Sequence, residues 1–129
     1  MAERGEIRNR KFANQVRDFK GMRWRNITPT DIDGFCDFGN ELFVFIEWKF
    51  GDTQMPSGQA LALERLCGAC RKAGIPSYVL LAHHQDAGDI DCANAECIDY
   101  YGNEWHKLKQ SQTVKELIDY LIRKHGKDK

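Results

Sequence analysis

The sequence lacks a long apolar segment, internal repeats, low-complexity tracts and any excess of one charge sign. Its longest apolar run, Leu42 to Ile46, is far too short to cross a membrane. Its 129 residues, 42% hydrophobic and 29% charged, suit one globular domain with a single core. These properties exclude a disordered tail, a collagen-like chain and a membrane protein. The first residues are charged, unlike a signal peptide, so we expect a cytoplasmic protein, in the host cytoplasm if a phage encodes it.

The net charge of zero hides an uneven distribution of charge along the chain. Residues 1–25 carry eight Lys and Arg against three acids, and residues 107–129 carry seven against three. Residues 26–106 carry four against thirteen, so basic ends flank an acidic centre. Basic terminal segments can simply cover the surface, or they can contact phosphates beside an acidic site that holds a cation. In the second case the zero total predicts modest, salt-sensitive affinity for a nucleic acid.

The five cysteines are odd in number and follow no signal peptide, so a disulfide framework is not expected. The spacing of Cys67 and Cys70, followed by Cys92 and Cys97, allows a four-cysteine zinc site. However, Cys67 and Cys70 continue an apolar stripe at helical spacing, where a free cysteine behaves as a small buried hydrophobe. We therefore expect core cysteines and keep a zinc-binding interaction module as an alternative.

Hydrophobic periodicity and turn residues predict one α/β (α+β) domain over residues 1–129, with a mixed central β-sheet flanked by helices. The expected order of elements is α-β-β-α-β-β-β-α. The expected parts are a basic N-terminal helix at 3–20, a core at about 27–83, and a C-terminal hairpin and helix at 97–125. Strands are predicted at 31–38, 42–50, 75–82, 97–101 and 104–108, with a helix at 58–73 between the second and third.

Local signals define several of these boundaries. Gly39-Asn40 suits the turn of a hairpin, and Ser57 is a candidate N-cap. Thr113 and Glu116 have the spacing of a capping box that opens the last helix. The strand at 75–82 follows a helix, so we expect it to run parallel to its neighbour in the sheet.

The second predicted strand interrupts its apolar run with Glu47-Trp48-Lys49. Because side chains alternate along a strand, Glu47 and Lys49 share one face and Trp48 points the other way. A three-residue loop at 39–41 pairs residues whose numbers add up to about 80 and places Asp33 opposite Glu47. A two-residue turn would move Asp33 to the other face. We expect the first register, which gathers Asp33, Glu47 and Lys49.

Two carboxylates and one ammonium group in one place have clear chemical uses. Carboxylates bind hard cations such as Mg²⁺, and the cation polarises a phosphoryl group and acidifies a water. Lys49 can position that water or offset the charge that builds up on the phosphate. An isolated Glu-x-Lys is more often an ordinary salt bridge in a strand, so the surrounding residues decide between the two interpretations.

The residues around this group resemble a known nuclease family. They are Pro29-Thr30-Asp31-Ile32-Asp33-Gly34, then a hairpin, then Phe45-Ile46-Glu47-Trp48-Lys49. This arrangement is similar to the PD-(D/E)xK nuclease superfamily, whose fold is restriction-endonuclease-like. The literal Pro-Asp pair is absent, because Thr30 separates Pro29 from Asp31, so Asp31 is an alternative to Asp33 as the metal ligand.

The following segment extends the resemblance. Ser57-Gly58-Gln59 opens a helix that ends before an apolar strand, as in the VRR-NUC and phage or archaeal Holliday-junction-resolvase branches. The similarity covers about residues 27–83. It implies a structure-specific enzyme of phage or prophage type.

The resemblance implies a metal-dependent deoxyribonuclease that hydrolyses phosphodiester bonds in DNA with Mg²⁺, for which Mn²⁺ is a substitute. It places metal binding on Asp33 and Glu47, the catalytic lysine on Lys49 and an auxiliary catalytic role on Gln59. Glu6, in the expected N-terminal helix, is a further auxiliary acid.

DNA is the expected partner, and no membrane is expected. The candidate phosphate contacts are basic residues near the N-terminus: Arg8, Arg10, Lys11, Arg23 and Arg25. A homodimer is also expected, because cutting both strands needs two sites. The main alternative function is a catalytically inactive nucleic-acid-binding domain of the same fold.

Overall fold

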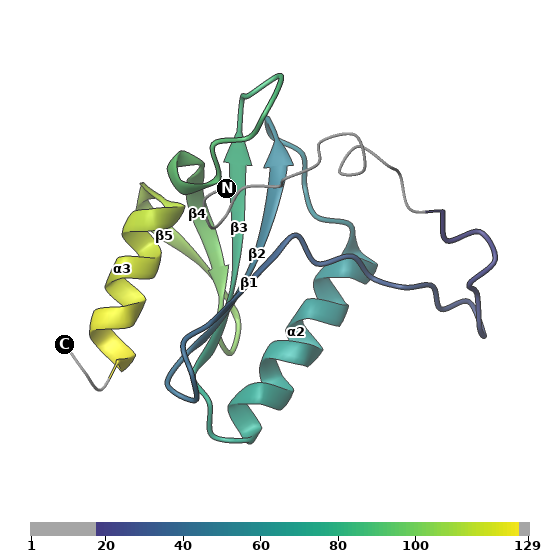
Figure 1. Ribbon diagram of the computed structural model, residues 1–129, viewed down its shortest axis with the longest axis horizontal. Coiled ribbons are helices and arrows are strands. Elements are labelled where there is room, and N and C mark those ends of the chain that lie inside the picture. The colour runs from purple at the N-terminus through teal and green to yellow at the C-terminus, as the bar shows by residue number, and fades with distance from the viewer. Residues whose placement is uncertain (1–17, 127–129) are drawn as a thin grey trace, which may run out of the picture.

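The computed structural model describes residues 18–126, which form a five-stranded mixed β-sheet with one α-helix against each face (Figure 1). In spatial order the strands are β1 (Gly34–Asp37), β2 (Phe43–Phe50), β3 (Ser77–His84), β4 (Glu96–Tyr101) and β5 (Trp105–Thr113). The helices are α2 (Ser57–Lys72), α3 (Val114–His125) and the short 3-10 helix η1 (Cys92–Asn94). A single α+β domain with a mixed sheet is therefore confirmed for these residues.

The strand pairing places the candidate site at one end of β2. Strands β2 and β3 are parallel and are joined by α2, as predicted, and the other neighbours are antiparallel. In the β1–β2 hairpin Phe35 lies opposite Phe45, and the Phe38 N–H donates to the Leu42 oxygen at 3.0 Å. The loop is therefore the three-residue one, and Gly39 provides its positive φ of 69°. The predicted register is confirmed.

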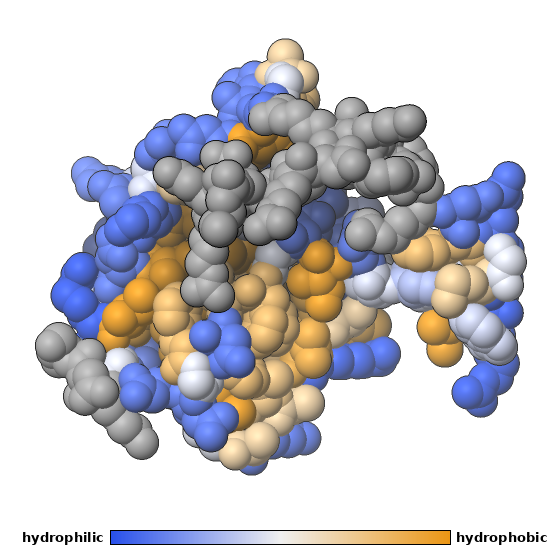
Figure 2. Space-filling view, in the orientation of Figure 1, coloured by the Kyte–Doolittle hydropathy of each residue, from blue (hydrophilic) through white to orange (hydrophobic). Residues whose placement is uncertain are grey.

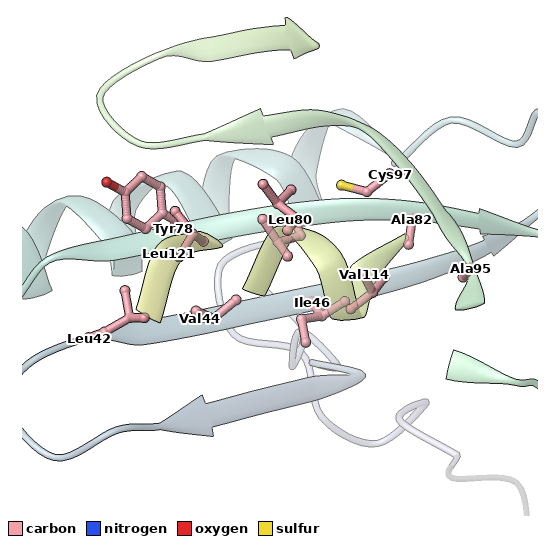
Figure 3. Close-up of a cluster of buried hydrophobic side chains, with 11 residues drawn as sticks. Leu42, Val44, Ile46, Tyr78, Leu80, Ala82, Ala95, Cys97, Val114 and Leu121 are labelled. Carbon is pink, nitrogen blue, oxygen red and sulfur yellow. The ribbon is translucent and has the colours of Figure 1, made fainter. Parts of the chain in front are cut away.

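The two faces of the sheet are buried in separate apolar clusters. Val44 and Leu80 pack with α3 residues such as Leu121 on one face (Figure 3). Phe45 and Val79 pack with Leu63 and Cys67 of α2 on the other. Alternate residues of β2 thus enter opposite clusters, which explains why this strand is apolar almost throughout.

The helix ends agree only in part with the sequence signals. Thr113 Oγ1 accepts from the Glu116 N–H and Glu116 Oε1 accepts from the Thr113 N–H, so the capping box is confirmed. The prediction for Ser57 was wrong, because α2 begins at Ser57 itself and the N-cap position is Pro56, without a side-chain cap. Gly74, with a φ of 95°, follows the end of α2. No helix within residues 18–126 has the length and apolar character needed to span a membrane.

Other predicted boundaries need correction. Residues 1–17 of the predicted N-terminal helix lie outside the described residues, and residues 18–20 are not helical. Strand β1 begins at Gly34 rather than at residue 31. Strand β5 continues to Thr113 instead of ending at residue 108. This edge strand is mostly exposed and polar, so it lacks the alternation of apolar residues that marks a half-buried strand.

The segment before β1 makes a turn of its own. Trp24 and Ile27 pair across Arg25 and Asn26, which both have positive φ. The segment projects beyond the N-terminal end of α2 (Figure 1). Trp24 and Ile27 are each 60% exposed, and Figure 2 shows apolar residues on this projection and on the β1 side of the domain.

Candidate metal and catalytic site

Glu47 is the buried acid of the candidate site. It lies on the α2 face of β2, two residues after the core residue Phe45, and only 1% of it is exposed. Its Oε2 accepts from the Asp33 backbone N–H at 2.9 Å, and its Oε1 accepts from Gln59 Nε2 at 2.7 Å. Both carboxylate oxygens therefore have a donor, which reduces the cost of burying this group in an apolar sheet.

Asp33 lies just before β1 and completes a reciprocal link with β2. Its Oδ2 accepts from the Trp48 backbone N–H at 3.0 Å, while its own N–H donates to Glu47. At Asp33 these two bonds replace the backbone pairing that joins β1 to β2 from Gly34 onwards. Strand β1 therefore begins at Gly34. The predicted juxtaposition of Asp33 and Glu47 is present.

Gln59 connects the glutamate to the lysine. Lys49 Nζ donates to Gln59 Oε1 at 3.1 Å, and Gln59 Nε2 donates to Glu47. Gln59 lies in the first turn of α2, so the helix start positions one amide against both residues of the Glu-x-Lys motif. Its Nε2 also lies 3.3 Å from the Asp31 backbone oxygen.

The structure distinguishes the two candidate aspartates. Asp33 presents its carboxylate to the hairpin, whereas the Asp31 contact with this group is through its backbone oxygen. Asp31 lies before β1, so it has no strand partner opposite Lys49. Glu6 lies outside the described residues.

The position of Glu47 changes its acidity. Burial raises the pKa of Glu47, and the charge of Asp33 adds to the increase. The Asp33 backbone N–H and the charge of Lys49 act in the opposite direction. Because the folded pKa is raised, the neutral form contributes stability that is fully present below the ordinary pKa. That stability is lost as the pH rises through the raised pKa.

In metal-free buffer we therefore expect Glu47→Gln to be at least as stable as the unmodified chain at about pH 8, because it removes a buried charge. The difference in the free energy of unfolding should shrink as the pH falls to about 5. Urea unfolding in EDTA across this range measures it, with the exposed-site variant Glu104→Gln as the control. A Glu47→Gln chain that is less stable at every pH would contradict this expectation.

The donor set of the site fits a hard cation. Mg²⁺ usually binds proteins through one or two carboxylates and takes its remaining ligands from water and phosphate oxygens. Asp33 and Glu47 provide two such carboxylates, and Asp33 Oδ2 and both Glu47 oxygens already accept one N–H each. Within residues 18–126 no group of three or more His, Cys, Asp or Glu could hold a metal ion. The protein can thus supply only part of a coordination shell here.

Trp48 lies behind this group and ties it to a distant loop. Its side chain packs against the α3 core, and its Nε1 donates to the Cys92 oxygen at 3.2 Å. A Cβ on Gly34 would lie 2.8 Å from the Trp48 ring, so glycine is needed for this packing. Sequence reasoning predicted the direction of Trp48 but missed both contacts.

The loop before β4 brings further acids towards the site. Burial raises the pKa of Cys92, and the charges of Asp91, Asp33 and Asp86 raise it further. Within this loop Asp86 Oδ2 accepts from the Asp91 backbone N–H at 3.0 Å. The acidic composition of residues 85–96 is a sequence signal for this group, but its position depends on the Trp48 contact.

A groove of about 660 Å³ lies beside the site, between residues 26–31 and the start of α2. Gln59 and Arg65 line it, so it connects the candidate site with a basic side chain. Arg23 and Arg25 are exposed on the projecting segment. The other predicted phosphate contacts lie outside the described residues: Arg8, Arg10 and Lys11.

The four cysteines do not form one zinc site. Cys67 is buried on the α2 face of the sheet and Cys97 on the α3 face, so the sheet separates them. Cys92 is exposed. Burial raises the pKa of the Cys97 thiol to about 12, with a further contribution from Asp99. Cys67 and Cys97 are core cysteines, as predicted, and they lie on opposite faces of the sheet rather than in one cluster.

The structure thus brings together Asp33, Glu47, Lys49 and Gln59, as the sequence predicts. The main feature that the structure adds is the pair of hydrogen bonds that join Gln59 to Glu47 and to Lys49. No protein-family model, curated protein or solved structure matches this chain.

Proposed function

We propose that this chain is a Mg²⁺-dependent DNA endonuclease of the PD-(D/E)xK, restriction-endonuclease-like type. The observation that supports it most strongly is the linked group of Asp33, Glu47, Lys49 and Gln59 at one end of β2. A glutamate with 1% exposure in a mostly apolar strand is costly, and a role in binding a cation explains its presence.

Each residue has a role that follows from its position. Asp33 and Glu47 would hold Mg²⁺ or Mn²⁺, and the bound ion would polarise the scissile phosphate and acidify a water. Gln59 fixes the Glu47 carboxylate and receives Lys49 Nζ, so it orients both. The Lys49 ammonium then offsets the negative charge that develops on the phosphate, or positions the attacking water.

The DNA would approach along the side of the domain where the projecting segment and the start of α2 lie. The groove beside Gln59 leads to Arg65, and the exposed Arg23 and Arg25 offer contacts to the phosphate backbone. We extend the proposal to a structure-specific, junction-resolvase-like enzyme of phage or prophage type that acts as a homodimer.

A cleavage panel tests the function. The purified chain is incubated with four-way junction, flap, duplex and single-stranded DNA, in Mg²⁺ and in EDTA. We expect cleavage only with Mg²⁺ or Mn²⁺, and faster cleavage of the junction than of plain duplex. Cleavage in EDTA would contradict the proposal, as would the absence of cleavage of all four substrates with either metal.

An inactive nucleic-acid-binding domain is the second candidate. It is favoured by the small number of metal ligands, since only two carboxylates meet at the site in the part of the chain that the structure describes. Calorimetry separates the two functions. DNA binding without Mg²⁺ or Mn²⁺ binding would support the inactive domain.

A further inference from the structure

A second cavity lies away from the Glu47 site, between α3 and the β4–β5 hairpin. Its volume is about 380 Å³, which is within the range of ligand pockets in proteins. It lies on the α3 face near the start of β3, whereas Glu47 lies on the α2 face towards the end of β2. The side chains that matter below are Arg71, Tyr78, Tyr100, His106, Tyr120 and Lys124.

Arg71 is held in a fixed position at the wall of this cavity. Its Nε donates to the Ser77 oxygen at 2.8 Å, and its guanidinium carbon lies 4.7 Å from the centre of the Tyr78 ring. Its Nη1 lies 3.4 Å from Asn103 Oδ1. A Cβ on Gly102 would lie 2.6 Å from Arg71 Nη2, so glycine there leaves room for the guanidinium. Part of its donor capacity remains available to a ligand.

Two basic side chains, Arg71 and Lys124, line the cavity. Lys124 reaches it from α3, and no Asp or Glu is among its lining residues in the described part of the chain. Within residues 18–126, neither Arg71 nor Lys124 pairs with a carboxylate. His125 lies beside these cations, with its Nε2 2.6 Å from the Tyr78 hydroxyl. Burial lowers the pKa of His125, and the positive charges of Lys124 and Arg71 lower it further. Two cations without a carboxylate partner among residues 18–126, both at one cavity, favour an anionic ligand.

Aromatic rings form much of the remaining wall. Tyr100 stacks on His106 with ring centres 5.1 Å apart, and Tyr78 lies beside Leu121 at one end of the α3-face cluster (Figure 3). Tyr120 is 47% exposed. Flat rings of this kind bind the face of another aromatic ring.

We propose that this cavity binds a nucleoside phosphate, with the phosphate on Arg71 and Lys124 and the base against the tyrosine rings. A simple anion would use the cations but not the aromatic wall, and an apolar aromatic compound would use the rings but not the cations. A nucleoside phosphate uses both, and a planar guanidinium is well suited to phosphate oxygens. The ligand can be a free nucleotide or the phosphorylated end of a DNA strand.

Equilibrium dialysis of the unmodified chain in EDTA tests this inference with four probes: deoxyadenosine 5′-monophosphate, deoxyadenosine, inorganic phosphate and a 5′-phosphorylated trideoxynucleotide. We expect the monophosphate to bind at least about tenfold more tightly than deoxyadenosine or phosphate. The trinucleotide shows which of the two ligands the cavity binds. If the trinucleotide binds more tightly than the monophosphate, the ligand is the end of a DNA strand, and if it binds more weakly, the ligand is a free nucleotide.

Variants on α3 locate the site. Lys124→Gln should weaken binding of the monophosphate by about tenfold, because it removes a charged contact to phosphate. Tyr120→Ala should weaken the monophosphate but leave inorganic phosphate unchanged. Lys115→Gln is the matched control, since Lys115 is on the same helix, pairs with Asp119 at 2.8 Å and does not line the cavity.

Three results would overturn the inference: no binding of the monophosphate up to about 1 mM, equal affinity for inorganic phosphate, or the same effect of Lys124→Gln and Lys115→Gln. Far-ultraviolet circular dichroism of each variant confirms that it is folded. Because no metal is present and cleavage is not measured, these results leave the proposed nuclease activity untouched.

Discussion

Glu47→Gln is expected to reduce Mg²⁺-dependent DNA cleavage by about 10³-fold, because a metal ligand contributes several kcal/mol to stabilisation of the transition state. Glutamine retains one oxygen that can accept the Asp33 N–H, so the hairpin should remain intact, while the bond from Gln59 Nε2 to the other carboxylate oxygen is lost. Asp33→Asn should have a similar effect for the same reason, since its amide oxygen can still accept the Trp48 N–H. These variants are more informative than alanine, which would remove the acceptors along with the charge. The initial rate of cleavage of the preferred substrate is the measurement.

The matched control for these variants is Asp37→Asn. Asp37 is an exposed aspartate on β1, at the other end of the hairpin pairing from the candidate site. We expect its rate of cleavage to equal that of the unmodified chain. Calorimetry should show loss of Mg²⁺ binding in Glu47→Gln and retention in Asp37→Asn. Full cleavage by both Glu47→Gln and Asp33→Asn would refute the proposed active site.

Lys49→Met is expected to reduce cleavage by about 10²-fold while Mg²⁺ binding is retained. The cleavage rate falls because the variant lacks the charged donor that stabilises the negative charge developing on the phosphate. Methionine keeps the length of the side chain, and Gln59 keeps its bond to Glu47, so the carboxylates stay in place. Mg²⁺ affinity should be unchanged or slightly higher, because the variant removes a positive charge near the carboxylates. Rates at saturating Mg²⁺ and calorimetric titration without DNA measure the two quantities separately.

Lys72→Met provides the control for this second variant. Lys72 is an exposed lysine at the C-terminal end of α2, and the same substitution there should leave cleavage unchanged. If Lys49→Met abolished Mg²⁺ binding as fully as Glu47→Gln, Lys49 would have a structural role in holding the carboxylates. If it cleaved at the normal rate, Lys49 would have no catalytic role.

Several features of the fold were accessible from the sequence because they depend on neighbouring residues. The three-residue loop after Phe38 set the hairpin register, and that register alone placed Asp33 beside Glu47. Thr113 and Glu116 predicted the start of α3. Polar segments were harder to predict. Strand β5 pairs along an exposed edge, where burial imposes no apolar alternation, so its length was underestimated.

The candidate site itself was predicted in outline but not in detail. The alternation of Glu47 and Lys49 with apolar residues indicated a shared charged face. The role of Gln59 as an acceptor for Lys49 and a donor to Glu47 required the position of α2 across the sheet. Likewise, the distinction between Asp31 and Asp33 became clear only when β1 was seen to begin at Gly34.

By itself the sequence determined the order of strands and helices from β1 to α3, the hairpin register and the group of charged residues at one end of β2, because these follow from alternation, turn length and capping over a few residues. Tertiary structure alone decided the contacts between distant segments. It brought the Cys92 loop onto Trp48, separated Cys67 from Cys97 by the sheet, and closed the cavity around Arg71. The physical reason is that such contacts depend on how the helices pack on each face, and no local signal encodes that packing.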